Sequence, residues 1–479
     1  MRYLILIHRY LGTAIGILMV GWCLSGIVMM YVRYPAVSQA ERLRQLKPLA
    51  WRECCTLGAN SIPTGATVEG FQVENLAGHP MLHVQFSDRS RELIALSDGR
   101  PLAGVSRPLA ADVAREAGTG PPPRLLGLLT YDEWTVSGEF NRARPLYLFA
   151  RDDAAGTQVY VSARTGRVVQ QTTSHQRFWN WIGAVPHWLY FAQLRRNVAL
   201  WSQVVIWTSL AGCFLVLFGL YIGIRQFLHR PAGRWSGYRG LMYWHHVPGL
   251  IFGLFALTWV TSGLVSMNPW GFLDSAGAGG EMDDLIGPPI SAAAVYQAVR
   301  ALPAASLPPD VVAVESSRLF GQLYIVATRT DGTRLRLRSD GTPTPLADPD
   351  WNRITEKLGG KSTAVADLIT MGDSYYSSRA GVPAQLPVVR VTNSDNGMRY
   401  YLDPVTGAPL EVLDSDARWY RWLHRGLHTL DFAPLLRSRP LWDVLMVTLL
   451  AGAALLCGTG TWLGWRRYIR IRPGRPNRN

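Results

Sequence analysis

The chain has 479 residues, of which 48% are hydrophobic and only 17% carry a charge. This composition is typical of a membrane protein with sizeable polar domains and argues against a wholly soluble enzyme. The formal net charge of +14 would suit a nucleic-acid-binding protein, but the basic residues cluster in short segments beside apolar stretches, which excludes nucleic acid as the partner. Five cysteines over this length provide no disulfide framework.

Four apolar stretches are long enough to cross a lipid bilayer as helices. Each has 22 residues or more, whereas about 20 are needed to span the hydrocarbon core. We interpret the first as an uncleaved anchor, because its apolar run is much longer than that of a typical signal peptide. The predicted spans are Tyr10–Val32, Val198–Ile224, Val247–Leu273 and Val444–Trp465.

The charges beside these stretches predict their orientation. The connector between the second and third spans carries several arginines and no acid, as does the tail after the fourth span. The long segment 274–418, in contrast, has more acidic than basic residues. Because short basic loops stay in the cytoplasm, we expect a multi-pass protein with both termini cytoplasmic and both long segments outside.

An internal repeat is the strongest feature of the sequence. A shift of 237 positions places the first span on the third and pairs His8 with His245 and Trp22 with Trp259. A shift of 241 positions pairs residues 177–225 with 418–466, including His187 with His428. We infer two tandem copies of one unit, each with two spans around an outer domain.

The two outer segments combine short strands, turns and helices. The strand predictions rest on β-branched and aromatic runs bounded by polar turns. The stretches 118–123 and 277–289 are rich in glycine and proline, and we interpret them as linkers. The predicted fold is therefore membrane α-helical, with four transmembrane helices in two tandem repeats and two extracytoplasmic α+β domains. Strands are expected at 82–86, 93–96, 147–149, 158–162, 168–169, 323–327, 334–338, 399–402 and 410–412, and helices at 110–117 and 292–301.

This interpretation divides the chain into eight parts. Each copy starts with a span and ends with an aromatic, amphipathic segment that leads into a second span; these interfacial segments are 178–194 and 419–436. The parts are a first span (1–34), a first outer domain (35–176), an interfacial segment with the second span (177–225), a basic loop (226–244), a third span (245–273), a second outer domain (274–417), an interfacial segment with the fourth span (418–466) and a basic tail (467–479).

Four histidines carry the predicted chemistry. His8 and His245 lie at the inner ends of the first spans, and His187 and His428 lie just before the second spans. Ionisable residues at membrane depth are costly and are usually functional. Two copies with the same orientation are related by an axis along the membrane normal, so equivalent imidazoles can face each other across it, as the axial ligands of a six-coordinate haem iron do. The sequence predicts two such haem sites, one near each membrane face.

Small and aromatic residues near these histidines are further candidates. Gly12, Gly16, Gly249 and Gly253 lie one and two helical turns from His8 or His245 and would leave room for a flat macrocycle. The alternative is close helix packing through a small-x-x-x-small pattern. Trp22 and Trp259 either line the predicted haem sites or belong to the apolar core of the helices.

Two histidines have no counterpart in the other copy. His246 corresponds to Arg9, and His424 corresponds to Gly183, so both are neighbours or alternative ligands of the predicted sites. His424 and His428 are four residues apart and share a helical face, although a structural zinc site normally has four protein ligands. Asp431 is a candidate acceptor that would orient His428.

A family resemblance rests on Ile-His-Arg-Tyr-Leu-Gly at the start of the first span, the Thr-Gly turns, and Leu-His-Arg-Gly-Leu-His-Thr-Leu-Asp-Phe at 423–432. These motifs resemble the PepSY-associated transmembrane family of bacterial inner membranes. The resemblance implies two PepSY-like outer domains and a protein with two haem b groups, held by His8, His245, His187 and His428. It further implies reduction of ferric iron, bound to a siderophore or another chelate, in the periplasm.

No dinucleotide-binding glycine motif follows a predicted strand, so we expect the electron donor to be a quinol or a separate reductase. Two alternatives remain open at this point. In one, the protein is a non-enzymatic membrane module whose outer domains bind or inhibit a periplasmic partner. In the other, it is a permease component for iron or a siderophore.

Overall fold

The computed structural model describes residues 1–51, 54–58, 61–275, 277, 279–305, 307–359, 365–378, 384–432 and 438–471. The chain forms two compact units, each built from separate parts of the sequence. The helical unit comprises Met1–Tyr34, Gln176–Asp274 and Asp416–Asn479. The second unit, rich in β-sheet, comprises Pro35–His175 and Ser275–Ser415.

In the part of the helical unit that the structure describes, there are four long helices. All four are long and apolar enough to cross a membrane, so the four predicted apolar helices are present. Four boundaries differ clearly from the prediction: the first helix begins at Arg2, the third begins at Leu241 and ends at Ser266, shortly before Pro269, and the fourth ends at Ile471. The helices are α1 (Arg2–Met29), α7 (Val198–Leu228), α8 (Leu241–Ser266) and α15 (Leu441–Ile471).

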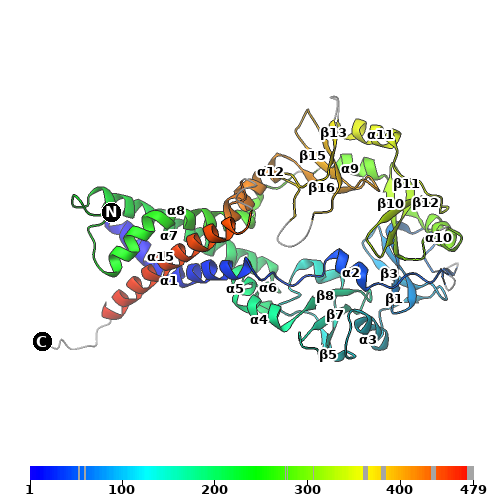
Figure 1. The fold of residues 1–479 in the computed structure, drawn as a ribbon, viewed down its shortest axis with the longest axis horizontal. Coiled ribbons are helices and arrows are strands. Elements are labelled where there is room, and N and C mark those ends of the chain that lie inside the picture. Colours follow the sequence, from blue (N-terminus) through cyan, green and yellow to red (C-terminus); the bar gives the residue numbers. More distant parts are fainter. Residues whose placement is uncertain are drawn as a thin grey trace. The chain divides into compact units, whose positions relative to one another are not determined.

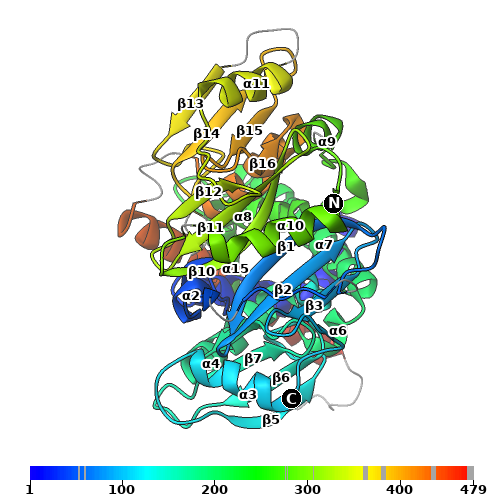
Figure 2. The same cartoon turned by 90° about the vertical axis from the view of Figure 1, so that its right-hand side faces the viewer.

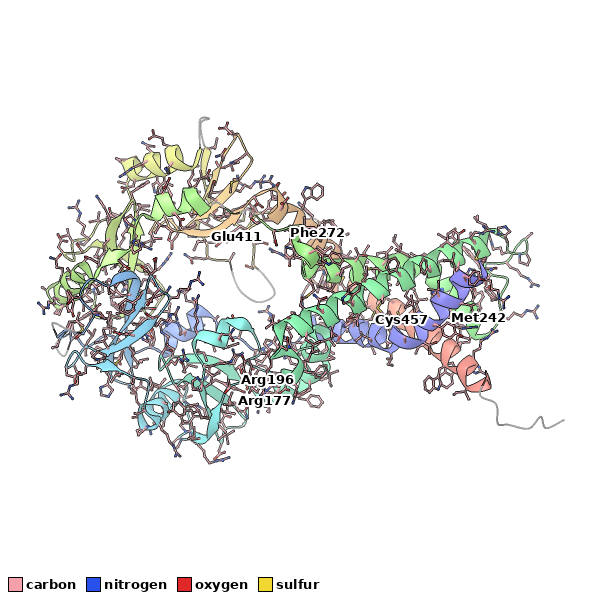
Figure 3. All side chains as sticks on the ribbon, turned by 180° about the vertical axis from the view of Figure 1, so that it is seen from behind. Arg177, Arg196, Met242, Phe272, Glu411 and Cys457 are labelled. Carbon is pink, nitrogen blue, oxygen red and sulfur yellow. A yellow bond between two sulfur atoms is a disulfide. The ribbon has the colours of Figure 1, made fainter. Side chains whose placement is uncertain are left out.

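The four helices pack as a bundle in which α1 and α8 each contact both α7 and α15. Figure 1 shows them running side by side, and Figure 3 labels Met242 near the start of α8 and Cys457 on α15. Their buried side chains form one apolar core to which each helix contributes. This core includes Met19, Cys23, Cys213, Val216, Ala256, Trp259, Met446, Leu449 and Ala453.

Short helices precede α7 and α15, where the interfacial segments were predicted. In both places a helical turn that carries a histidine ends at a leucine in the left-handed conformation, Leu189 or Leu430. Residues 433–437, at the end of the second predicted segment, lie outside the described residues. The short helices are α4 (Ser174–Ile182), α5 (Ala184–Trp188), α6 (Ala192–Arg195), α12 (Ser415–Tyr420), the π-helical turn η5 (Arg421–Gly426) and α13 (Leu427–Thr429).

An eight-stranded sheet organises the other unit. Its path is β12-β11-β10-β1-β2-β3-β4, with β9 paired to β1, and strands from the first and second outer segments meet where β1 pairs with β10 (Figure 2). The strands are β1 (Thr67–Leu76), β2 (His79–Phe86), β3 (Arg91–Ala95), β4 (Pro101–Leu102), β9 (Ile290–Ser291), β10 (Val311–Leu319), β11 (Gln322–Arg329) and β12 (Arg334–Arg338).

This shared sheet differs from the prediction of two separate outer domains. At the junction, Gln72 lies opposite Glu315 and Val73 opposite Val314 in antiparallel register. The buried side chains on one face form a common core that includes Val73, Val314 and Ile325. The two outer segments therefore fold as a single unit, because each supplies half of one sheet.

Among the described residues of this unit there are also two four-stranded sheets, one from each outer segment. The predicted strands at 158–162, 334–338 and 399–402 are confirmed in full, and the other predicted strands are confirmed with boundaries that shift by a few residues. The strands are β5 (Arg124–Leu129), β6 (Leu146–Ala150), β7 (Gln158–Ser162), β8 (Val168–Thr172), β13 (Val365–Ile369), β14 (Val388–Thr392), β15 (Arg399–Leu402) and β16 (Pro409–Leu413).

The helices of this unit cover the sheets. The prediction of a linker over 277–289 is wrong in part, because α9 occupies most of it: Glu281 lies in its first turn, where an acid is favourable, and Leu285 is buried. Cys54 and Cys55 form a disulfide that the sequence analysis did not anticipate. The remaining helices are α2 (Gln39–Gln45), α3 (Arg107–Glu116), α9 (Gly279–Ile286), α10 (Ala292–Ala301) and α11 (Asp348–Gly359), with short 3-10 turns η2 (Gly138–Arg142), η3 (Pro269–Gly271) and η4 (Leu302–Ala304).

Candidate functional site

The helical unit brings His8 of α1 and His245 of α8 together, with ring centroids 6.1 Å apart. His8 Nδ1 lies 2.9 Å from the backbone oxygen of Leu215, and His245 Nδ1 lies 3.2 Å from that of Leu456. A carbonyl oxygen can only accept, so each Nδ1 carries the proton and donates it. The Nε2 atoms, which have no hydrogen-bond partner among the described residues, are left unprotonated, the form in which an imidazole nitrogen can bind a metal ion.

Two glycines make room for these imidazoles. A Cβ atom at Gly219 of α7 would lie 2.6 Å from Cε1 of His8, and one at Gly460 of α15 would lie 2.7 Å from Cε1 of His245. Both distances are shorter than any ordinary carbon contact, so a side chain at either position would displace the ring. The 241-residue shift pairs these glycines, and this signal could have identified them as site residues from the sequence.

A second pair, His187 of α5 and His428 of α13, has ring centroids 6.0 Å apart. His187 Nδ1 contacts Ser25 Oγ at 3.0 Å and the Trp22 carbonyl oxygen at 3.1 Å. His428 Nδ1 contacts Ser262 Oγ at 2.9 Å. Both serine hydroxyls donate to the carbonyl three residues earlier, so they accept from the imidazoles and again leave Nε2 as the unprotonated nitrogen.

The protonation state of the second pair suits metal binding. Burial lowers the pKa of His187 to about 3, with a further contribution from His428. Burial likewise lowers the pKa of His428 to about 4. Both imidazoles are therefore neutral at physiological pH, which is the form that binds a metal ion.

The spacing within each pair fits one metal ion between two imidazoles. An imidazole nitrogen binds a transition metal at about 2 Å, and the ring centroid lies roughly 1 Å behind that nitrogen, so two axial rings have centroids about 6 Å apart. The observed 6.1 and 6.0 Å agree with this value. The described residues contain no group of three or more His, Cys, Asp or Glu that could hold a bare metal ion. Two imidazoles at this spacing are compatible with the two protein ligands of a six-coordinate haem iron.

The two pairs lie at different depths of the bundle. His8 is in the second turn of α1, whereas the contacts of His187 are made at Trp22 and Ser25 of the same helix. With a rise of 1.5 Å per residue, the pairs are separated by roughly 21–26 Å along α1. This separation is close to the thickness of the hydrocarbon core.

The other two candidate histidines are placed differently. Both ring nitrogens of His246 are already bonded, Nδ1 to Ser236 Oγ at 2.8 Å and Nε2 to the Gly223 carbonyl oxygen at 2.9 Å, which leaves no nitrogen for a metal. His424 stacks on His428 with ring centroids 5.5 Å apart and is thus a neighbour of the second pair.

Asp431 does not orient His428, contrary to the expectation from the sequence. Its carboxylate and its backbone oxygen both accept from Arg421, at 2.8 Å each. Arg421 is almost fully buried, and a buried guanidinium needs such an acidic partner. Ser262 takes the predicted place of Asp431 at the imidazole.

The four candidate glycines face neighbouring helices. A Cβ at Gly16 would meet Thr461 Oγ1 of α15, and one at Gly253 would lie 2.7 Å from Leu220 Cδ2 of α7. Gly12 and Gly249 face Leu215 and Leu456 at 3.6 and 3.2 Å. These contacts favour the close-packing interpretation over a space for a macrocycle.

The two candidate tryptophans belong to the bundle core or pack against it, and they differ in one respect. Trp259 Nε1 donates to the backbone oxygen of His428 at 3.0 Å. Trp22 Nε1 is buried without a hydrogen-bond partner among the described residues. An unsatisfied buried donor costs about 1–3 kcal/mol, and a bound group that offers an acceptor would remove this cost.

The family described as the PepSY-associated TM region matches residues 5–354 of the sequence. The chain belongs to this family. The match includes His8, His187 and His245 and ends before His428. Comparison with curated proteins gives no significant match. Membership of this PepSY-associated family and the four apolar helices together establish a membrane protein.

Proposed function

We propose that this PepSY-associated protein carries electrons across the bacterial inner membrane through two haem b groups and reduces ferric iron, bound to a siderophore, in the periplasm. The observation that carries the proposal is the presence of two imidazole pairs. The ring centroids of His8 and His245 are 6.1 Å apart, and those of His187 and His428 are 6.0 Å apart. In both pairs the Nδ1 atoms are bonded and the Nε2 atoms are open. One such pair could arise by chance packing, but two pairs, each with equivalent contacts on its two histidines, argue for one repeated function.

The protein residues would bind and orient the two groups. A haem, when bound, supplies one-electron transfer between ferric and ferrous iron. The hydrogen bonds at Nδ1 fix each imidazole plane and raise the basicity of Nε2. The apolar core around Met19, Val216 and Ala453 would keep water away from the path between the pairs.

The proposal treats the chain as two tandem copies, each with a PepSY-like outer segment. Equivalent residues support this repeat: Leu215 and Leu456 accept from the first pair, and Ser25 and Ser262 accept from the second. The basic segments 226–244 and 467–479 support cytoplasmic termini. In this orientation the His8–His245 pair would lie near the cytoplasm and the His187–His428 pair near the periplasm.

Each Fe(III) takes up one electron and leaves its chelator more easily as Fe(II). A quinol would release two electrons and two protons and so serve two turnovers, while a separate reductase would deliver electrons singly. The chain's own role would be to position the two groups at the two depths and to connect the donor side with the chelate side.

The test starts from the full chain, purified after expression with added haem. We expect absorption bands that shift on reduction with dithionite, and reoxidation of the reduced protein by a ferric trihydroxamate siderophore, with Fe(II) captured by a coloured chelator. A protein that stays colourless would contradict the proposal and would favour the alternative of a non-enzymatic module that binds a periplasmic partner. Uptake of the ferric siderophore into proteoliposomes without a reductant would instead support the permease.

A further inference from the structure

The sheet-rich unit contains the same cleft twice, once filled and once open. In both places a short helix (α2 or α9), a longer helix (α3 or α11) and the turn of a β-hairpin (β1–β2 or β10–β11) surround the cleft. The hairpin turns correspond, because Ala77–Gly78 and Phe320–Gly321 both have positive φ angles. Figure 1 shows α9 beside β10, and α11 packs against α9.

Charged side chains fill the first cleft. Glu74, fully buried, accepts from Arg167 and from Arg42, the latter at 2.8 Å. Burial alone would raise the pKa of Glu74, but Arg167 and the other basic groups around it hold this pKa far below its usual range. A cavity of only about 30 Å³ remains, so this cleft has no room for a ligand.

The second cleft lacks these side chains. Ser317 stands at the hairpin position of Glu74, and Ala408 follows the Thr-Gly turn where Arg167 follows it in the first copy. The resulting cavity is about 620 Å³, within the range of small-molecule sites. Its lining includes Asp283, Ile286, Pro288, Phe320 and Arg353.

Two charged residues that line the cleft, Arg353 and Asp283, have no ion-pair partner among the described residues. The guanidinium of Arg353 lies 3.9 Å from the centroid of the Phe320 ring. The other charges are paired, Arg318 with Glu69 at 2.7 Å and Asp284 with Lys357 at 2.6 Å. The cleft therefore offers one open cation and one open anion.

We propose that the second cleft binds a small zwitterionic molecule of amino-acid or dipeptide size. Its carboxylate would pair with Arg353 and its ammonium group with Asp283, while its apolar body would lie against Ile286, Pro288 and Phe320. A guanidinium held on an aromatic face is a common carboxylate-binding arrangement. This inference is independent of electron transfer, since no histidine of the helical unit takes part.

The test measures binding of the dipeptide leucyl-phenylalanine to the full chain by calorimetry, alongside its N-acetylated and C-amidated forms. Each modification removes one charge, so each should weaken binding at least about tenfold. Arg353→Gln should abolish the difference between the free and the amidated peptide, and Asp283→Asn that between the free and the acetylated peptide. Arg115→Gln on α3, beside the filled cleft, is the matched control and should bind all three peptides like the unmodified chain.

Each variant should lose the affinity difference for one modified peptide and keep the difference for the other. A misfolded variant would lose both differences, so this pattern separates direct charge recognition from misfolding. We expect a millimolar dissociation constant, so the peptide is added up to about 10 mM. Absence of binding to the unmodified chain at that concentration would overturn the proposal. Binding that neither variant changes would overturn it too.

Discussion

The two histidine pairs have nearly the same spacing but are held in different ways. His8 and His245 lie within long helices, and backbone oxygens accept their Nδ1 protons. His187 and His428 lie on short helices that end in left-handed turns, and serine hydroxyls accept their protons. The first pair thus depends on helix geometry, whereas the second depends on individual side chains that a substitution can remove.

The largest effect is expected from removing a ligand. His187→Ala should abolish one of the two haem groups and retain the other, because the pairs lie roughly 21–26 Å apart along α1. His8→Ala should give the complementary loss. Haem content and the reduced absorption spectrum measure both variants, and loss of both groups in either variant would mean that the two sites are not independent.

A smaller but still strong effect is expected at the glycines behind the first pair. Gly219→Ala would place a Cβ 2.6 Å from His8 Cε1 and should displace the imidazole, so that haem occupancy at the first pair falls by half or more. Gly263→Ala on α8 is the control, because a Cβ there meets nothing within 4 Å. If both variants retain full occupancy, the imidazole position is not set by Gly219.

Removal of a serine should weaken the second pair without destroying it. Ser25→Ala deletes the hydroxyl that accepts from His187 Nδ1, while the Trp22 carbonyl oxygen remains within 3.1 Å. Loss of such an orienting partner typically lowers metal affinity by 10- to 100-fold, and we expect a value near the lower end. A haem titration of the apoprotein measures it; Ser25→Thr, which keeps the hydroxyl, should restore the affinity.

The smallest effect is expected at His246. Its two ring nitrogens bond Ser236 and Gly223, so His246→Ala should lower the thermal unfolding temperature by a few degrees and leave the haem content unchanged. A variant that loses one haem group would instead make His246 a ligand and would remove His8 or His245 from the first pair.

The sequence predicts which histidines lie near each other, because the two shifts superimpose residues whose ring centroids are 6.1 and 6.0 Å apart. It does not reveal Ser25 and Ser262 as the acceptors, since the choice between Ser262 and Asp431 depends on side-chain direction and on the buried charge of Arg421. Gly219 and Gly460 were visible as repeated residues, but their role requires the distance to the imidazoles.

The outer segments were harder to predict for a different reason. Strand β1 contains a buried Glu74 that breaks the apolar pattern, and its burial depends on Arg42 and Arg167 far away in the sequence. The pairing of β1 with β10 joins segments more than two hundred residues apart. Local periodicity carries no information about such a contact.

The most direct test of the account is the number of haem groups per chain, measured by extracting the haem from protein of known concentration. We predict two for the unmodified chain and one for the double variant His187→Ala/His428→Ala. A value of zero for the unmodified chain, or no change between the two proteins, would contradict the claim that opposed imidazoles hold haem at two depths.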